Sequence, residues 1–312
     1  SLSQPSNLTS EEFFILSKVK LYFDHIEIIM KKFRPKFTLT ICDLQTIERV
    51  ITEVAEKFNS VTITHQHGQM KKTNPLLKYT ISNYIVVWGE QTRKNFIDLF
   101  EKTKIIVLGT DIYQELFEKA IEANEDEKTF ITLALNPRSN EINFFIIEKV
   151  CKQMNNLSAK ERMKYSLVLK LHPEMNIRYW SSKFISYIKA SSLKMEYKIY
   201  TDQNEYVLKK SKILIVLSSS ITLQAFICNV SVICVESIPD LYKNPAVFFN
   251  RIPESVVKIG NLSREIQNGL QNSHYNRTII SKQKLSLKEE IAFFDASLRE
   301  KEWINTLDKT LA

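Results

Sequence analysis

Three of the five histidines follow short apolar runs, which are predicted strands. Side chains at these positions are the first candidates for catalysis or binding. His65 and His67 follow the run Val61–Thr64 and flank Gln66, so both imidazoles point to the same side of an extended segment. An imidazole titrates near neutrality and can accept the proton of a substrate hydroxyl, which makes His67 the first candidate for a catalytic base, with His65 beside it. A metal pair and a structural role are the alternatives, but no neighbouring carboxylate or cysteine completes a zinc ligand set.

A second group of polar residues is suited to binding phosphate. His172 follows the apolar run 166–171, with Lys170 two residues before it. Ser218–Ser220 precede a predicted helix, and a serine-rich helix N-terminus both caps the helix and attracts an anion. A core histidine and a simple helix cap are the corresponding structural interpretations.

The chain contains only 5 glycines, and neither a G-x-G-x-x-G fingerprint nor a P-loop occurs in it. Any phosphate must therefore be held by side chains and helix N-termini. No Asp-x-Asp sequence is present either, so catalysis is expected without a divalent metal or another cofactor. The acidic run Glu125–Glu127 could bind a metal, but a solvated linker is the favoured interpretation.

Predicted strands and helices alternate along the whole chain, which is typical of a parallel sheet covered by helices. Strands are expected at 37–42, 61–64, 84–88, 104–108, 130–135, 166–171, 196–200, 213–217 and 230–235. Helices are expected at 10–32, 44–59, 91–100, 112–123, 141–154, 180–190, 222–228 and 286–311.

The polar, acidic segment 122–128 interrupts this alternation and predicts a linker between two domains. We therefore expect an α/β protein with two Rossmann-like domains. The GT-B arrangement, in which the two domains face each other across a cleft, fits this pattern, and other doubly wound pairs fit it as well. The expected N-terminal domain covers residues 1–124 and the expected C-terminal domain residues 125–285, while residues 286–312 are expected to form a C-terminal helix that packs back.

Ligands of open parallel sheets bind beyond the carboxyl ends of the strands, so the residues that follow each predicted strand are the candidate site. In the first half, Trp88 and Glu90 follow one strand, while Gly68 and Gln69 extend the loop of His67. In the second half, the corresponding residues are Asn136, Arg138, Lys170, His172, Pro173, Ser218, Ser219 and Ser220.

Composition narrows the class of partner. The chain is 44% hydrophobic and has a net charge of +8, which favours anionic partners. No zinc finger, RNA-recognition signature or basic stretch interleaved with aromatic residues occurs, so nucleic acid is not an expected partner. Basic residues lie in or beside the first predicted helix, which makes an anionic membrane surface a further candidate, although such a helix more often packs into a core.

Sequence features also favour the cytoplasm, with a peripheral position at the inner membrane as a further expectation. No signal peptide and no long apolar span is visible. The four widely spaced cysteines (Cys42, Cys151, Cys228 and Cys234) are expected to be free thiols.

The motifs resemble those of bacterial sialyl- and polysialyltransferases, capsule Kdo transferases and CDP-glycerol glycerophosphotransferases. The resemblance rests on His172-Pro173, on Ser218–Ser220 and on the loop Gln66-His67-Gly68, and it extends over roughly residues 34–236. In those families the His-Pro and Ser-Ser/Thr motifs hold a cytidine nucleotide, which implies a CMP-linked donor here. The acidic motif that provides the base in sialyltransferases has no clear match, which leaves His67 as the base and Glu90 in reserve.

The resemblance implies an inverting, metal-independent glycosyltransferase. It would move a sugar from a nucleotide-linked donor to an oligosaccharide, polysaccharide or glycolipid acceptor of a bacterial surface. Residues 1–124 would then be the acceptor-side domain and residues 125–285 the nucleotide-sugar-binding domain of a GT-B pair. Gly68, Gln69 and Trp88 would contact the acceptor. The alternatives are a nucleotide-sugar epimerase of the same fold, a CDP-glycerol-type phosphotransferase, and a non-catalytic basic module that docks on membranes.

Overall fold

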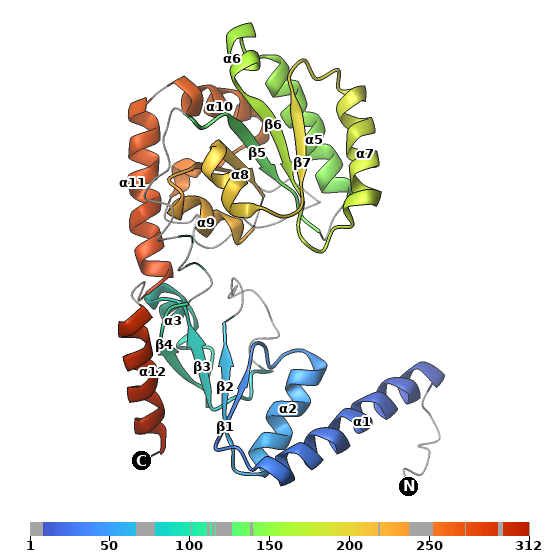
Figure 1. Ribbon diagram of the computed structural model, residues 1–312, viewed down its shortest axis with the longest axis vertical. Coiled ribbons are helices and arrows are strands. Elements are labelled where there is room, and N and C mark those ends of the chain that lie inside the picture. Colours follow the sequence, from blue (N-terminus) through green and yellow to red (C-terminus); the bar gives the residue numbers. More distant parts are fainter. Residues whose placement is uncertain are drawn as a thin grey trace. The chain divides into compact units, whose positions relative to one another are not determined.

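The computed structural model describes residues 9–66, 79–100, 102–110, 113, 116, 127–137, 140–217, 219–236, 252–271, 273–292 and 296–311. The chain divides into two compact units, residues 1–109 with 290–312, and residues 110–289. Each unit contains one parallel sheet with helices packed on it, so the predicted pair of parallel α/β domains is confirmed (Figure 1). In this division the first unit ends before the acidic segment, and the last helix groups with the first unit.

The first unit has a four-stranded sheet whose strands lie side by side in chain order. They are β1 (Phe37–Thr40), β2 (Val61–His65), β3 (Tyr84–Val87) and β4 (Lys104–Val107). Helix α2 (Thr46–Lys57) connects β1 to β2, and α3 (Glu90–Phe96) connects β3 to β4. All neighbouring strands are parallel, so their carboxyl ends lie along one edge.

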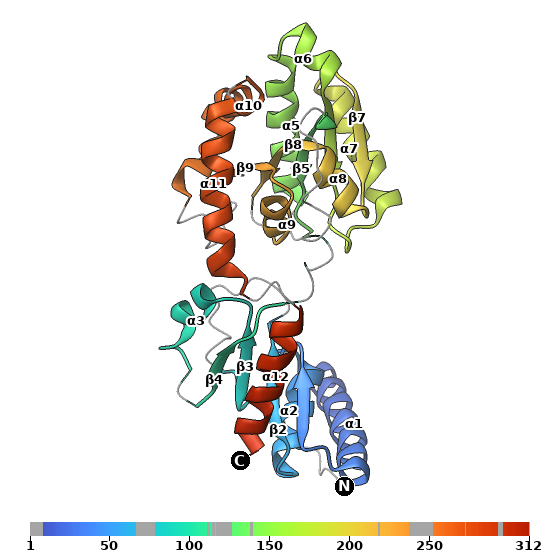
Figure 2. The same cartoon turned by 60° about the vertical axis from the view of Figure 1, so that its left-hand side comes forward.

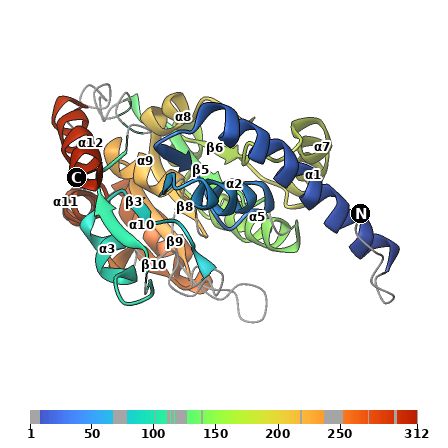
Figure 3. The same cartoon turned by 90° about the horizontal axis from the view of Figure 1, so that it is seen from below.

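Helix α1 (Ser10–Phe33) precedes the sheet and packs along α2 (Figure 3). It begins at a capping box, in which Thr9 accepts from the backbone N–H of Glu12 and the Glu12 side chain accepts from that of Thr9. It ends at Arg34, whose φ of 43° lies in the left-handed region typical of helix ends.

The C-terminal part forms two helices, whereas the pattern predicted one over 286–311. Helix α11 (Ser273–Glu290) belongs to the second unit, and α12 (Ala296–Leu311) packs against the first sheet (Figure 2). The helix is interrupted where Ile291 is buried and where the N–H of Ala292 donates to the carbonyl of Trp88, at 2.7 Å. Trp303 of α12 packs against the sheet residues Ile63 and Val86.

The second unit has a six-stranded sheet in the order β10-β9-β8-β5-β6-β7. Its strands are β5 (Phe130–Ala134), β6 (Ser166–Lys170), β7 (Tyr197–Tyr200), β8 (Ser211–Val216), β9 (Ser231–Val235) and β10 (Val256–Val257). The first strand, β5, lies in the middle, with β6 on one side and β8 on the other. This is the strand order of a dinucleotide-binding Rossmann sheet. The chain adds β6 and β7 on one side of β5, then crosses over and adds β8, β9 and β10 on the other side, so the strand order reverses between β5 and β8.

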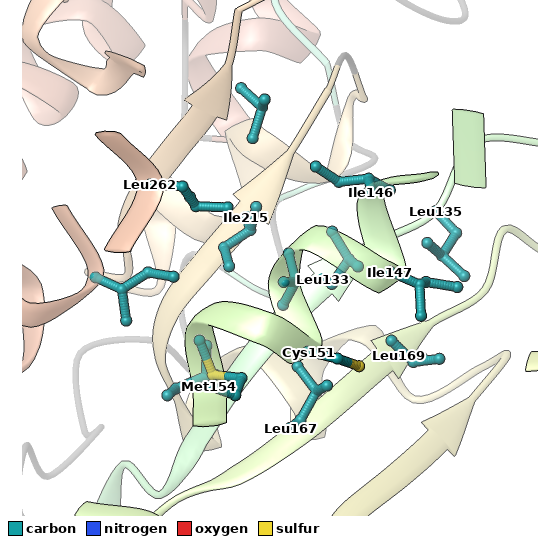
Figure 4. Close-up of a cluster of buried hydrophobic side chains, with 14 of the residues drawn as sticks. Leu133, Leu135, Ile146, Ile147, Cys151, Met154, Leu167, Leu169, Ile215 and Leu262 are labelled. Atoms are coloured by element: carbon teal, nitrogen blue, oxygen red, sulfur yellow. The ribbon is translucent and has the colours of Figure 1, made fainter. Parts of the chain in front are cut away.

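Helices cover this sheet and bury its central strands on both faces. They are α5 (Asn140–Asn155), α6 (Ala159–Lys164), α7 (Ile177–Ala190), α8 (Asn204–Lys210), α9 (Ile221–Ile227), α10 (Leu262–Gln271) and α11. Every residue of β5, β6 and β9 is buried, which explains why these strands are mostly apolar and do not alternate between apolar and polar residues. Leu133, Leu169 and Ile215 of the sheet pack against Ile147 and Cys151 of α5 (Figure 4).

Candidate functional site

The carboxyl edge of the second sheet gathers most of the predicted donor residues. Asn136 follows β5, Ser219 and Ser220 follow β8, and His172 follows β6, which are three neighbouring strands. The strand order reverses between β5 and β8, and in open parallel sheets ligands bind outside the carboxyl ends of the strands at such a reversal. The sheet topology thus brings Asn136, His172 and Ser219, which are more than 35 positions apart in the sequence, to the same edge of the second sheet.

Ser219 and Ser220 lead into α9 at this edge. The carbonyl of Ser219 accepts from the N–H of Thr222 at 3.2 Å, and its Oγ accepts from the N–H of Ile221 at 3.4 Å. Ser220 occupies the N-cap but makes no side-chain capping hydrogen bond. Its hydroxyl is therefore not needed to cap the helix.

His172 is half-exposed in the turn that leaves β6, and Pro173 follows it. Its Nδ1 accepts from the backbone N–H of Glu174 at 3.3 Å, which places the proton of a neutral ring on Nε2. The Glu174 carboxylate lies 3.7 Å from the same Nδ1 and would pair with a protonated ring. In either state Nε2 carries a hydrogen that can be donated to a phosphate oxygen.

Lys170 is buried at the end of β6. Its Nζ donates to the carbonyls of Leu171, at 2.9 Å, and of Thr201. Burial lowers the pKa of this ammonium group, while the nearby Asp202 acts in the opposite direction. These contacts join the ends of β6 and β7, and a contact of Lys170 with donor phosphate stays a prediction.

Asn143 supports a predicted donor residue, Asn136, and the sequence did not single it out. It lies fully buried on α5, where its Oδ1 accepts from the N–H of Asn136 at 2.9 Å and its Nδ2 donates to the carbonyl of Asn136 at 2.6 Å. This two-way contact fixes the backbone that leaves β5. The sequence does contain a signal for Asn143, because an amide at an apolar position of the predicted helix 141–154 indicates a buried hydrogen bond.

In the first unit, His65 is held against α12. Its ring stacks on Trp303, with centroids 6.4 Å apart and an interplanar angle of 16°, and Nδ1 lies 2.9 Å from the carbonyl oxygen of Gln66. These contacts support a structural role for His65. Glu90 is exposed at the start of α3, where its carboxylate accepts from Nε of Arg93 at 2.8 Å.

Trp88 also differs from expectation, because its side chain is only 2% exposed. Its backbone N–H donates to Oε1 of Gln66 at 2.9 Å, and its ring Nε1 donates to the carbonyl of Gln66 at 2.8 Å. Trp88 therefore supports the loop after β2 and has almost no surface left for an acceptor. The predicted residues His67, Gly68, Gln69, Arg138 and Ser218 lie outside the described residues.

Asp43, which follows β1, binds the segment that precedes β3 in the first unit. It lies three residues before α2 begins. Its buried carboxylate accepts from the N–H groups of Ile81 and Ser82, at 2.9 and 3.1 Å, and from the Ser82 hydroxyl. Asp43 thus orders the segment that enters β3.

A cavity of about 810 Å³ lies at the β9–β10 end of the second unit. It is lined by Glu236, Pro253, Glu254, Val256, Val257, Lys258, Asn261, Arg264, Glu265, Asn268 and Tyr275. None of the predicted donor residues lines it. Within the described residues, no three His, Cys, Asp or Glu side chains gather closely enough to bind a metal ion, and no helix is both long and apolar enough to cross a bilayer.

No protein-family model and no curated protein sequence matches this chain. Solved structures, however, share its fold. UDP-GlcNAc 2-epimerase from Neisseria meningitidis, bound to UDP-GlcNAc, superposes with a TM-score of 0.60 at 16% identity, covering 99% of this chain and 84% of the epimerase. Anabaena HepE in complex with UDP gives a TM-score of 0.55 at 12% identity, covering 92% and 82%.

Trehalose 6-phosphate synthase from Burkholderia multivorans gives a TM-score of 0.63 at 10% identity, covering 98% of this chain and 78% of the synthase. At these identities the likeness establishes the fold alone. The predicted GT-B fold class is confirmed. The finer resemblance to sialyl-, polysialyl- and Kdo transferases finds no support among these structures.

Proposed function

We propose that this chain is an enzyme of GT-B fold that binds a nucleotide-linked sugar at the carboxyl edge of its second sheet. The observation that carries the proposal is the gathering of Asn136, His172, Ser219 and Ser220 around the reversal point of a Rossmann-ordered sheet. Such a crevice is where open parallel sheets bind nucleotides. Hydroxyl groups and an imidazole N–H are suitable donors to a diphosphate, and they replace the glycine-rich loop that this chain lacks.

The nucleotide we favour is a uridine diphosphate. Three structures of the same fold were solved with UDP or UDP-GlcNAc: Anabaena HepE, the Neisseria meningitidis epimerase and the Staphylococcus aureus MnaA. This preference replaces the CMP-linked donor that the sequence motifs implied.

The reaction we favour is sugar transfer with inversion. An acceptor hydroxyl attacks the anomeric carbon, the bond from that carbon to the diphosphate oxygen breaks, and UDP leaves. His67, or Glu90 in its place, takes the hydroxyl proton. His172 Nε2 and the hydroxyls of Ser219 and Ser220 stabilise the charge that develops on the diphosphate. The acceptor we expect is a saccharide of a bacterial surface polymer or glycolipid.

Epimerisation at the sugar is the second candidate. It is favoured by the superposition of 99% of this chain on a UDP-GlcNAc 2-epimerase. Such a reaction needs proton transfer at the sugar but no acceptor, and the same diphosphate contacts would serve it.

Nuclear magnetic resonance of the substrate separates the candidates. The protein is incubated with UDP-GlcNAc, UDP-glucose or CMP-sialic acid, with and without saccharide acceptors, and the ³¹P and ¹H spectra are followed. Release of UDP that requires an acceptor supports transfer. A changed configuration at C2 without an acceptor supports epimerisation. Turnover of the CMP-linked sugar alone would contradict the preference for uridine, and turnover of none, together with no nucleotide binding, would contradict the proposed function.

A further inference from the structure

Helix α1 uses only one of its faces to pack on the first unit. Met30 is buried, and Val19, Phe23 and Ile26 are partly buried against α2. The rest of this 24-residue helix faces away from α2 and carries an unusual share of large apolar side chains. Phe13, Phe14, Ile15, Leu16, Leu21, Ile28, Ile29 and Phe33 are each 44–67% exposed.

The exposed apolar residues form two rows. Seven residues span nearly two helical turns, so residues seven apart lie above one another. Phe14, Leu21 and Ile28 make the first row and are 67%, 54% and 64% exposed. Ile15 and Ile29, fourteen residues apart, mark the second row on the side nearer α2 and are 52% and 47% exposed.

A basic row runs between them. Lys18, His25 and Lys32 are also seven residues apart, and the helical angle places them between the two apolar rows. Lys18 lies over the ring of Tyr22, with Nζ 5.9 Å from its centroid, and Lys32 lies over Phe33 at 5.2 Å. We define the docking face of α1 as these two apolar rows with the basic row between them.

One acidic residue of α1 lies in line with the basic row, and the others lie elsewhere. Glu11, in the first turn, is seven residues before Lys18 and faces the same way. Asp24 and Glu27 lie on the opposite flank, where they pair with Lys20 at 2.8 Å and Lys31 at 3.0 Å. Among the described residues, these ion pairs of α1 use the lysines of that flank. Beyond the first turn, the docking face is therefore apolar and positively charged at the same time.

We propose that the docking face of α1 binds an anionic lipid bilayer. Phe14, Leu21 and Ile28 would enter the boundary between headgroups and acyl chains, while Lys18 and Lys32 would lie against lipid phosphates. Two copies of this chain pairing through the same face would bring their basic rows together, which disfavours a second copy as the occupant. A soluble polyanion would use the basic row but would leave both apolar rows in water. The inference goes beyond the proposed enzymatic function and does not depend on it.

Sedimentation with vesicles tests the proposal on the full chain. We expect binding to vesicles of phosphatidylglycerol in phosphatidylcholine and none to phosphatidylcholine alone. Lys18→Gln with Lys32→Gln should lower the partition coefficient about 10- to 30-fold, since each basic residue near an anionic surface contributes about a factor of five. Phe14→Ser, Leu21→Ser and Ile28→Ser together should abolish binding. All five positions are exposed, so circular dichroism should show an unchanged fold.

Lys20→Gln with Lys31→Gln is the matched control, because it removes the same charge from the opposite flank of the same helix. An equal loss in this control would overturn the assignment of the face, and absence of binding by the parent chain would overturn the proposal itself. A dimer in analytical ultracentrifugation that the triple serine variant dissociates, without vesicle binding, would assign the face to a second copy instead.

Discussion

His172 lies at the edge where the nucleotide is expected, and its Nε2 carries a ring hydrogen that no described contact of the other ring nitrogen uses. The Glu174 backbone N–H occupies the other ring nitrogen. His172→Ala should therefore leave the fold intact and weaken UDP binding roughly 10- to 100-fold, the range for one charge-assisted hydrogen bond. Calorimetric titration measures this loss. His274→Ala, which removes an exposed histidine of α11, is the control, and equal affinity of the two variants would contradict the donor role of His172.

Cys151 makes a second prediction at the scale of a residue. Burial raises the pKa of its thiol to about 11. The unfolded chain ionises this thiol from about pH 9, so the stability it contributes is complete below pH 9 and is lost as the pH rises toward 11. Chemical denaturation gives the free energy of unfolding at each pH between 8 and 11. This free energy should fall with pH less steeply in Cys151→Ala than in the parent chain, by about 1 kcal/mol per pH unit. An identical slope in the variant would show that Cys151 titrates normally in the folded chain.

At the scale of an element, the α5 helix positions the loop after β5 through Asn143. Asn143→Ala leaves the N–H of Asn136 without its buried acceptor, which should lower the free energy of unfolding by about 1–3 kcal/mol. It should also weaken UDP binding, because the loop at the reversal point is released. Denaturant titration and calorimetry check both effects. Asn156→Ala, whose amide makes only an exposed contact with Gln153, should change neither.

Helix α12 makes the corresponding prediction for the first unit. Trp303→Ala removes the ring that packs on the first sheet and stacks on His65, and it should lower the free energy of unfolding by about 2–4 kcal/mol. Ile304→Ala, at an adjacent position that is 52% exposed, should have a much smaller effect in the same denaturant titration. UDP binding should survive in both variants, since α12 groups with the first unit and we propose that the second unit binds the nucleotide. Loss of UDP binding in Trp303→Ala alone would contradict that assignment.

The elements that the sequence predicted are those with strong local signals. Buried strands such as Phe130–Ala134 are continuous apolar runs, and α1 carries its own capping box, so neither depends on distant contacts to be recognised. Strand β10 has two residues and forms only by pairing with β9, and the break between α11 and α12 depends on burial of Ile291. Neither leaves a periodic pattern in the sequence.

At the scale of the whole molecule, topology brings the predicted donor residues to one edge, and the sequence could predict only the positions of polar residues after strands. It placed His172, Ser219 and Ser220 on one edge, because all strands of a parallel sheet end there. It could not foresee that Lys170 and Trp88 would be buried with backbone carbonyls of Thr201 and Gln66 as partners, since those contacts depend on packing between neighbouring strands. The contact of Asn143 with Asn136 was missed because an amide in a helix pattern does not indicate which backbone group it binds.

Hydrogen–deuterium exchange with and without UDP tests the proposed nucleotide site at the carboxyl edge of the second sheet, because it locates the nucleotide as well as detecting it. We expect slower exchange at saturating UDP in peptides that contain residues 135–143, 171–175 and 219–223, the segments that follow or support β5, β6 and β8. Peptides of the first sheet should change much less. Protection confined to the first unit, or no protection anywhere at saturating UDP, would contradict the proposed nucleotide site.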